Sequence, residues 1–251
     1  ERPGLLKKTL LENGISSSSF VALKNKGVLE TYSLEIGRLN KDEIETKEAH
    51  ALNLSQNIAY EEIRNVFQSF NVCLLYGVTS CGKTEIYIHL MQQIVSQRKQ
   101  VLFLLPEIAL TTQITHRLRL VFGNKLGIYH SKFSDAERVE IWQKQLSSTP
   151  YDIIVGVRSS IFLPFKKLGL VIVDEEHDGS YKQQDPAPRY NARNAAIVLA
   201  MQYHAKVLLG TATPSIESYY NTQIGKYGLV TLTERFQEIR LPRVEIVDCK
   251  E

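Results

Sequence analysis

The sequence has few of the residues that build metal centres or disulfide frameworks. Its 251 residues include three cysteines, at positions 73, 81 and 249, and none of them form a CxxC pair. Structural zinc sites and disulfide-rich domains both need closely spaced cysteines. We therefore expect neither a zinc site nor a disulfide framework in this chain.

Long hydrophobic runs and a strong charge bias are also missing. No run reaches the ~18 apolar residues of a membrane-spanning helix, and the N-terminal residues do not form a signal peptide. We therefore expect a cytoplasmic protein without a membrane partner. The net charge is +3, which is compatible with nucleic acid but does not require it. The opening Glu-Arg-Pro is not typical of a natural start, so we expect a piece of a longer protein.

The composition is that of a folded protein. Apolar residues make up 43% and charged residues 23%, enough to bury a core and too balanced for global disorder. A length of 251 residues suits one large domain or two smaller ones. We find no internal repeat and no low-complexity tract.

Residues 77–84, GVTSCGKT, match the phosphate-binding pattern G-x-x-x-x-G-K-[ST]. An apolar run precedes them and a helix-like apolar pattern follows to about residue 98. Backbone N–H groups of such a loop point at phosphate oxygens. We expect Lys83 at the β- and γ-phosphates of ATP and the Thr84 hydroxyl on Mg²⁺; the alternative is an ordinary glycine-rich turn. The predicted nucleotide-binding loop comprises Gly77, Val78, Thr79, Ser80, Cys81, Gly82, Lys83 and Thr84.

Apolar strands alternate with helices along the chain, which predicts an α/β fold with a mainly parallel sheet covered on both faces. Ligands bind such sheets at the carboxyl ends of the strands. Helices are expected from 52 to 70, from 108 to 121, after a Ser134–Glu137 capping box, and from 191 to 204. Strands are expected at 72–76, 101–105, 126–130, 152–155, 168–173 and 206–209.

The strand at 168–173 ends in Asp174-Glu175-Glu176-His177. A strand that ends in Asp-Glu fits the second half of a nucleoside triphosphate site. Asp174 is predicted to hold Mg²⁺, and Glu175 to orient or deprotonate the attacking water. His177 is predicted to bond hydroxyl or amide groups of the next motif. For Glu176 a structural and a functional role are both open.

Two further groups of residues each have two interpretations. Thr211 and Thr213 follow another strand, and their hydroxyls are predicted to link the carboxylates to the nucleic-acid side; helix capping is the alternative. Gln56 begins the helix ahead of the phosphate loop. Its amide offers a donor and an acceptor for an adenine edge, although a helix-start role is the simpler interpretation.

The N-terminal residues 1–45 suggest a small separate domain. A helix ending at Asn13-Gly14, a second helix after Ser16, and a strand at 28–34 form a winged-helix-like order, with a plain helical hairpin as the alternative. A polar linker covers residues 35–50. We therefore expect a DNA-binding domain at 1–45 and a nucleotide-binding lobe at 46–251.

Over roughly residues 50–250 the sequence resembles the DEXH-box helicases of superfamily 2, and among them the replication-restart helicases. The resemblance implies a RecA-like first motor lobe. The segments that carry it are GVTSCGKTEIY (77–87), LPEIALTTQ (105–113), HSKFSDAERVEIW (130–142), GVRSSIFLPFKKLGLVIVDEEHDGSYKQQ (156–184), RYNARNAA (189–196) and GTATPS (210–215).

The resemblance also implies roles for particular residues. Lys83, Asp174, Glu175 and His177 would act in ATP hydrolysis, with Gln56 at the adenine. The loop at 178–190 is similar to the family's aromatic-rich loop, so Tyr181, Lys182 and Arg189 would face DNA. Stacking of aromatic rings on unpaired bases and cation contacts with phosphates agree with this.

For the whole enzyme the resemblance implies 3′-to-5′ travel on forked and single-stranded DNA during primosome assembly. It also implies contacts with other primosome proteins and single-stranded-DNA-binding protein, and a monomer. The family's zinc insertion, 3′-end-binding domain and second lobe with its arginine finger have no counterpart here. We therefore expect the isolated chain to hydrolyse ATP very little.

The phosphate loop departs from the family pattern, which has Gly-Ser where this chain has Ser80-Cys81. Ser80 lacks the access of glycine to positive φ, and Cys81 is expected to be a reactive thiol because Lys83 and a helix N-terminus favour thiolate. Two other functions remain open. One is a P-loop ATPase or kinase with a small-molecule substrate, and the other is a non-catalytic DNA-binding module.

Overall fold

The computed structural model describes residues 16–29, 46–107, 109–110, 112–130 and 133–234. The chain forms two compact units, Glu1–Arg38 and Leu39–Glu251. In the first unit, helix α2 (Ser17–Asn25) begins at Ser16, whose hydroxyl accepts a hydrogen bond from the Ser19 backbone N–H at 3.1 Å. This is the predicted second helix. The predicted helix before it, most of the predicted strand after it and most of the linker lie outside the described residues, so the winged-helix interpretation stays a prediction.

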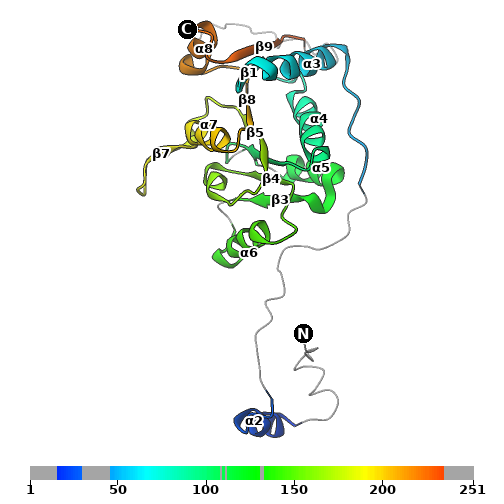
Figure 1. Ribbon diagram of the computed structural model, residues 1–251, viewed down its shortest axis with the longest axis vertical. Coiled ribbons are helices and arrows are strands. Elements are labelled where there is room, and N and C mark those ends of the chain that lie inside the picture. Colours follow the sequence, from blue (N-terminus) through cyan, green and yellow to red (C-terminus); the bar gives the residue numbers. More distant parts are fainter. Residues whose placement is uncertain (1–15, 30–45, 108, 111, 131–132, 235–251) are drawn as a thin grey trace, which may run out of the picture. The chain divides into compact units, whose positions relative to one another are not determined.

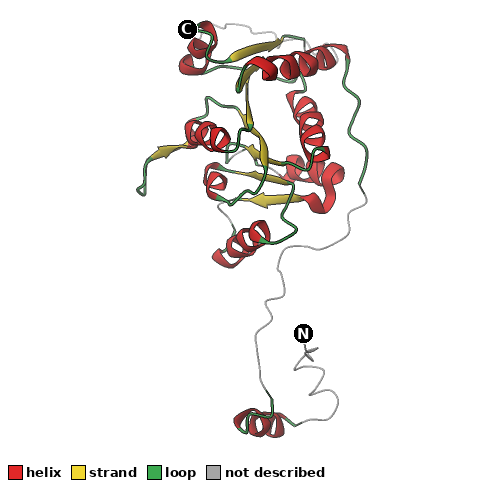
Figure 2. Ribbon diagram, in the orientation of Figure 1, coloured by secondary structure: helices red, strands yellow, loops and turns green. Residues whose placement is uncertain are grey.

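The second unit is built on a seven-stranded sheet of order β3-β4-β2-β5-β8-β1-β9, in which every recorded pairing is parallel (Figures 1 and 2). The predicted α/β architecture is therefore confirmed. The strands are β1 (Val72–Gly77), β2 (Gln100–Leu104), β3 (Leu126–Tyr129), β4 (Ile153–Gly156), β5 (Leu168–Asp174), β8 (Lys206–Thr211) and β9 (Gly228–Leu232).

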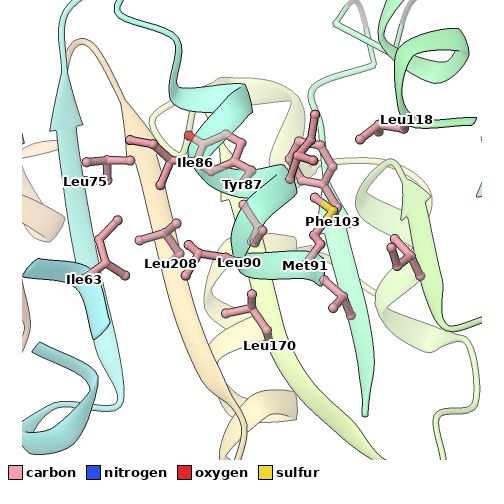
Figure 3. Close-up of a cluster of buried hydrophobic side chains, with 14 of the residues drawn as sticks. Ile63, Leu75, Ile86, Tyr87, Leu90, Met91, Phe103, Leu118, Leu170 and Leu208 are labelled. Atoms are coloured by element: carbon pink, nitrogen blue, oxygen red, sulfur yellow. The ribbon is translucent and has the colours of Figure 1, made fainter. Parts of the chain in front are cut away.

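Helices cover both faces of this sheet, which explains why the central strands are apolar throughout. On one face Ile63, Leu90 and Leu118, from three helices, pack against strand residues such as Phe103 and Leu208 (Figure 3). The second face is covered by side chains that include Ile141 and Ala196. The helices are α3 (Leu54–Ser69), α4 (Lys83–Ser96), α5 (Thr112–Phe122), α6 (Asp135–Leu146), α7 (Ala192–Gln202) and α8 (Ile216–Gln223). None of the helices within the described ranges is long and apolar enough to span a membrane.

The structure differs from the sequence-based elements in three places. Helix α5 begins at Thr112, later than the predicted start at 108, because the chain first makes a turn in which the Ala109 N–H bonds the Pro106 carbonyl at 2.9 Å. Strand β9 is not predicted from the sequence, nor is the antiparallel hairpin of β6 (Lys182–Gln183) and β7 (Tyr190–Asn191). The other six strands of the seven-stranded sheet and the capping box at Ser134–Glu137 are where the sequence places them.

The register of the sheet fixes where the motif-bearing loops meet. Gly210 of β8 lies opposite Leu75 of β1 on one side and Asp174 of β5 on the other. All three strands are parallel, so the phosphate loop, the DEEH segment and the GTATPS segment leave the sheet at the same edge.

Candidate nucleotide-binding site

The loop between β1 and α4 folds back over its own backbone. Lys83 is the first residue of α4, and its ammonium donates a hydrogen bond to the Gly77 carbonyl at 2.9 Å. Ser80 and Gly82 both have left-handed backbone angles, with φ of 62° and 83°. Cys81 between them does not have a positive φ. Left-handed residues that alternate with others turn successive N–H groups toward the inside of a loop, which is the geometry of an anion-binding concavity. Ser80 adopts this conformation despite its side chain, so the glycine of the family pattern is not needed there.

The glycines of the loop are tightly packed against neighbouring side chains. A Cβ atom at Gly77 would lie 2.9 Å from the Cys81 sulfur, and one at Gly82 would overlap the Gln56 amide nitrogen. Both positions therefore need glycine for space, and Gly82 needs it for φ as well. Val78 donates its N–H to the Leu232 carbonyl at 3.1 Å, which ties the loop to β9. Thr79 and Ser80 are exposed at the tip, and Thr84 is half-buried in the first turn of α4.

Gln56 lies under the phosphate loop and is only 1% exposed. Its side-chain oxygen accepts the Asn53 N–H at 3.0 Å, which completes the capping box of α3, and its amide nitrogen donates to the Cys81 carbonyl at 3.1 Å. The helix-start role is therefore present, together with a loop contact that the sequence does not indicate. The adenine contact of Gln56 stays a prediction.

The structure contradicts the expectation that Cys81 is a reactive thiol. The side chain is 1% exposed. Burial raises the pKa of the thiol and outweighs the opposing effect of the Lys83 charge. Desolvation of a thiolate is costly, so proximity to a lysine does not suffice to activate a buried sulfur.

Asp174 ends β5 with its carboxylate facing α4. Oδ1 accepts a hydrogen bond from the hydroxyl of Tyr87 at 2.8 Å. Burial raises the pKa of Asp174 to about 6, while the Tyr87 hydrogen bond and the Lys83 charge pull it down. The ends of β1 and β5 flank Gly210 of β8, so the phosphate loop that carries Lys83 and the Asp174 carboxylate lie at the same edge of the sheet.

Glu175 follows with a left-handed φ of 45°, unusual for a residue with a side chain. Strain of this kind is concentrated at functional sites. The turn is held on both sides, because the Glu176 N–H bonds the Gly210 carbonyl at 3.1 Å and the Asp178 N–H bonds the Glu175 carbonyl at 2.8 Å. The Glu175 side chain is half-buried, 3.7 Å from a ring nitrogen of His177.

His177 joins the DEEH segment to the GTATPS segment as expected. Its Nδ1 lies 2.8 Å from the Thr211 hydroxyl, and its Nε2 lies 3.2 Å from the Thr213 hydroxyl. Thr211 is buried and Thr213 is exposed. The three side chains form a short polar chain from the carboxylates toward solvent.

Glu176, whose role the sequence leaves open, is the buried centre of a second hydrogen-bond network. Its carboxylate accepts hydrogen bonds from Arg193 at 2.7 Å, from the Ser215 N–H at 2.6 Å and from the Ser218 hydroxyl at 2.8 Å. Burial opposes ionisation of Glu176, but these hydrogen bonds outweigh it and lower the pKa. Glu176 thus fixes α7 and the start of α8 to the DEEH segment.

The prediction that Tyr181 faces DNA is wrong in this structure. Its side chain is 1% exposed, and its hydroxyl donates to the backbone carbonyls of Asp174 at 2.6 Å and Leu104 at 3.1 Å. The apolar ring and its two acceptors favour the interior over a solvent-facing position. Lys182 and Arg189, by contrast, are exposed on the β6–β7 hairpin.

A cavity of about 710 Å³ opens beside that hairpin, away from the phosphate loop. Its walls come from the hairpin, α7, α8 and the segment after α8. Four cationic residues line it, with one carboxylate, that of Glu217. The cations are Lys182, Arg189, Arg193 and Lys226.

The residues at the phosphate loop fit a nucleotide-bound Mg²⁺. Within the described residues no cluster of three or more His, Cys, Asp or Glu side chains can hold a metal. Mg²⁺ in nucleotide sites needs no such cluster, since one or two protein oxygens combine with phosphates and waters. Asp174 and Thr84, at the same sheet edge, are oxygen donors of the required kind.

Comparison with known proteins agrees with this geometry. Residues 54–222 match the model of the DEAD/DEAH box helicase family. The chain is 40% identical over 256 aligned positions to replication restart protein PriA of Haemophilus influenzae, covering 98% of this chain and 34% of that protein. For PriA of Bacillus subtilis the identity is 38%, covering 98% of this chain and 30% of that protein. The chain therefore spans about a third of the length of these curated relatives.

Solved structures share the fold. RecG bound to a three-way DNA junction superposes with a TM-score of 0.55 at 22% identity, covering 76% of this chain and 25% of RecG. The Mycobacterium smegmatis helicase Lhr, bound to single-stranded DNA and AMP-PNP, gives a TM-score of 0.51 at 17% identity, covering 70% of this chain and 25% of Lhr. These likenesses establish the architecture of the lobe.

Proposed function

The chain belongs to the DEAD/DEAH box helicase family and, within it, to the PriA replication restart proteins, and on that premise we propose that the whole protein is an ATP-dependent 3′-to-5′ DNA helicase and translocase. It acts at stalled forks in primosome assembly and replication restart. The observation that carries the proposal is that the phosphate loop with Lys83 and the strand end with Asp174 lie at the same edge of the sheet. This chain supplies the nucleotide-binding first lobe.

In the proposed reaction the residues at the carboxyl edge of the sheet have separate roles. The loop N–H groups and Lys83 bind the phosphates of ATP, while Thr84 and Asp174 hold Mg²⁺, which neutralises charge on the phosphates when bound. Glu175 orients the attacking water and accepts its proton. The half-buried side chain of Glu175, directly after Asp174 at this edge of the sheet, supports this assignment.

We place DNA contact on the hairpin rather than on Tyr181. Lys182 and Arg189 are exposed there, next to a cavity whose lining also includes Lys226 and the partly exposed Tyr190. Cations that meet phosphates and rings that stack on bases are the usual elements of single-strand binding. Forked and single-stranded DNA are the proposed substrates.

Two features connect the nucleotide site to other parts of the lobe. His177, Thr211 and Thr213 extend from Glu175 toward solvent, and we assign this chain of side chains to the transmission of nucleotide state. Tyr181 lies directly before Lys182 and bonds the Asp174 backbone. Movement of the hairpin is therefore expected to change the hydrolysis site.

The whole protein needs parts beyond this chain. A cationic residue from a facing second lobe raises hydrolysis by orders of magnitude in this class of enzyme, so the isolated chain is expected to bind Mg²⁺–ATP and hydrolyse it very little. Other primosome proteins and single-stranded-DNA-binding protein are the proposed partners of a monomeric, cytoplasmic enzyme. A zinc site is proposed for the whole protein outside this chain.

The ATPase rate of the full-length protein with and without forked DNA tests the proposal, beside a Lys83→Ala variant. We expect strong stimulation by DNA and its loss in the variant. A rate that responds to a small metabolite instead would favour a small-molecule ATPase or kinase. Absence of any hydrolysis, with intact DNA binding, would favour a non-catalytic DNA-binding module.

A further inference from the structure

Tyr87 is a fully buried residue of α4 to which neither the motifs nor the comparisons assign a role. Its ring packs edge-on against Phe103 of β2, with 5.6 Å between the ring centres (Figure 3). On another side it fills the space over Gly210, where a Cβ atom would overlap its hydroxyl oxygen. The ring is therefore held between α4 and two strands, and the position of its hydroxyl is fixed.

That fixed hydroxyl donates to Oδ1 of Asp174 at 2.8 Å. The bond crosses from the helix of the phosphate loop to the strand that carries the predicted Mg²⁺ ligand. It commits one carboxylate oxygen and sets the rotation of the carboxylate plane.

Tyr181 contacts the backbone of Asp174. Its hydroxyl lies 2.6 Å from the Asp174 carbonyl and 3.1 Å from the Leu104 carbonyl, so a single donor spans β5 and β2 at the carboxyl edge of the sheet. Asp174 is thus held at its backbone by one tyrosine and at its side chain by the other. Directly after it, Glu175 turns into a left-handed conformation.

We propose that Tyr87 and Tyr181 are positioning residues for Mg²⁺, which fix the Asp174 carboxylate in the orientation that binds the metal. The inference rests on the proposed nucleotide site and deepens it. Partners that orient a ligating side chain commonly change metal affinity by about 10- to 100-fold when removed. Both act through Asp174 and are not expected to touch the nucleotide.

Tyr87→Phe tests this with the loss of one oxygen atom. In the full-length protein, binding of a fluorescent ATP analogue is titrated at a series of Mg²⁺ concentrations and in EDTA. We expect the half-saturating Mg²⁺ concentration to rise about 10-fold, while affinity for the analogue in EDTA stays unchanged. A general packing defect would weaken nucleotide binding both with Mg²⁺ and in EDTA. A change in the Mg²⁺ requirement alone therefore identifies a positioning role.

Tyr60→Phe is the matched control. Tyr60 lies in α3, and its hydroxyl donates to the Gln93 side chain of α4, the helix that also carries Tyr87, at 3.1 Å. This bond is away from the carboxylates. The control should leave the Mg²⁺ requirement at the wild-type value. An unchanged Mg²⁺ requirement in Tyr87→Phe, or equal weakening with and without Mg²⁺, would overturn the proposal.

Tyr181→Phe keeps the proposal testable should Tyr87→Phe fail to fold. It removes the backbone bond and leaves the carboxylate bond intact, and it should raise the Mg²⁺ requirement in the same direction. No rise would overturn the proposal. If the wild-type protein itself bound no nucleotide, the proposed function would fail; if it bound nucleotide normally and both tyrosine variants matched it, only this inference would fail.

Discussion

Glu176 of the DEEH segment and Arg193 of α7 form a buried ion pair, with 2.7 Å between Oε2 and Nη1 and side chains that are 0% and 10% exposed. Arg193 also lines the cationic cavity beside the hairpin. A single side chain thus borders the proposed DNA-binding cavity and bonds the residue next to Glu175.

Arg193→Gln should destabilise the fold strongly. Removing one member of a buried pair leaves an uncompensated charge, at a cost of about 3–5 kcal/mol. Urea denaturation measures the free energy of unfolding. The control is Glu61→Gln, which breaks the exposed Glu61–Arg64 pair on α3 and should cost less than about 1 kcal/mol. Similar small losses in both variants would contradict a buried, energetically important pair.

Asp174→Asn should stabilise the Mg²⁺-free protein at neutral pH. The folded pKa of Asp174 is raised from 3.8 to about 6, so the folded state binds the proton more tightly than the unfolded state. Stability from this group is complete below pH ~4 and falls as the pH rises through ~6, by up to about 3 kcal/mol for two pKa units.

Thermal unfolding of wild type and variant across pH, in EDTA, checks this. The variant lacks the carboxylate, and its amide oxygen can still accept the Tyr87 hydroxyl. Its advantage in melting temperature should be present at pH ~7 and disappear near pH ~4. An advantage independent of pH would mean that the buried carboxylate is not its source.

Gly82→Ala should damage the phosphate loop. The residue has φ of 83°, and a Cβ atom would overlap the Gln56 amide. Left-handed backbone alone costs about 1–2 kcal/mol per non-glycine residue, and displacement of Gln56 adds to this. We expect a lower melting temperature and at least ~10-fold weaker nucleotide binding, since about 1.4 kcal/mol corresponds to tenfold in affinity.

Gly179→Ala is the control for that substitution. A Cβ atom added at Gly179 would meet no other atom within 4 Å, and its φ is not among the positive values. Melting temperature and nucleotide affinity should stay close to wild type. Equal damage from both substitutions would show that loss of glycine, rather than the loop geometry, is responsible.

Cys81 should react slowly with iodoacetamide in the folded protein. Only the thiolate reacts, and burial raises the pKa of this thiol. Mass spectrometry of the peptide that carries Cys81 gives the rate at mildly alkaline pH, with the same protein unfolded in urea as the reference. We expect labelling at least ~10-fold slower in the folded state. Faster labelling in the folded state would restore the reactive-thiol hypothesis.

The sheet is well predicted from the sequence because its signals are local. Buried parallel strands are short apolar runs, and the phosphate loop and the Ser134–Glu137 capping box are patterns of a few adjacent residues. Strand β9 is missed because its run of five residues is short and is interrupted by Gly228 and Thr231. The hairpin at Lys182 is missed because its strands have two residues each.

The contacts that hold the site together cannot be predicted in the same way. Tyr181 lies in a polar loop, which favours an exposed position, but its hydroxyl finds two carbonyl acceptors beneath the sheet edge. Tyr87 is hidden among the apolar residues of α4, although a buried tyrosine usually has an acceptor for its hydroxyl. Asp174 is 87 residues from Tyr87, and Leu104 is 77 residues from Tyr181, so only the fold brings these partners together.

The most direct test of the account is a double-mutant cycle on Lys83 and Asp174. Binding of Mg²⁺ and a non-hydrolysable ATP analogue is measured calorimetrically for wild type, Lys83→Ala, Asp174→Ala and the double variant. If both side chains bind one nucleotide–metal unit, the two losses will be non-additive, with a coupling of about 0.5–3 kcal/mol. In EDTA only Lys83→Ala should weaken binding. Strictly additive losses, or an effect of Asp174→Ala that persists without Mg²⁺, would contradict a shared ligand.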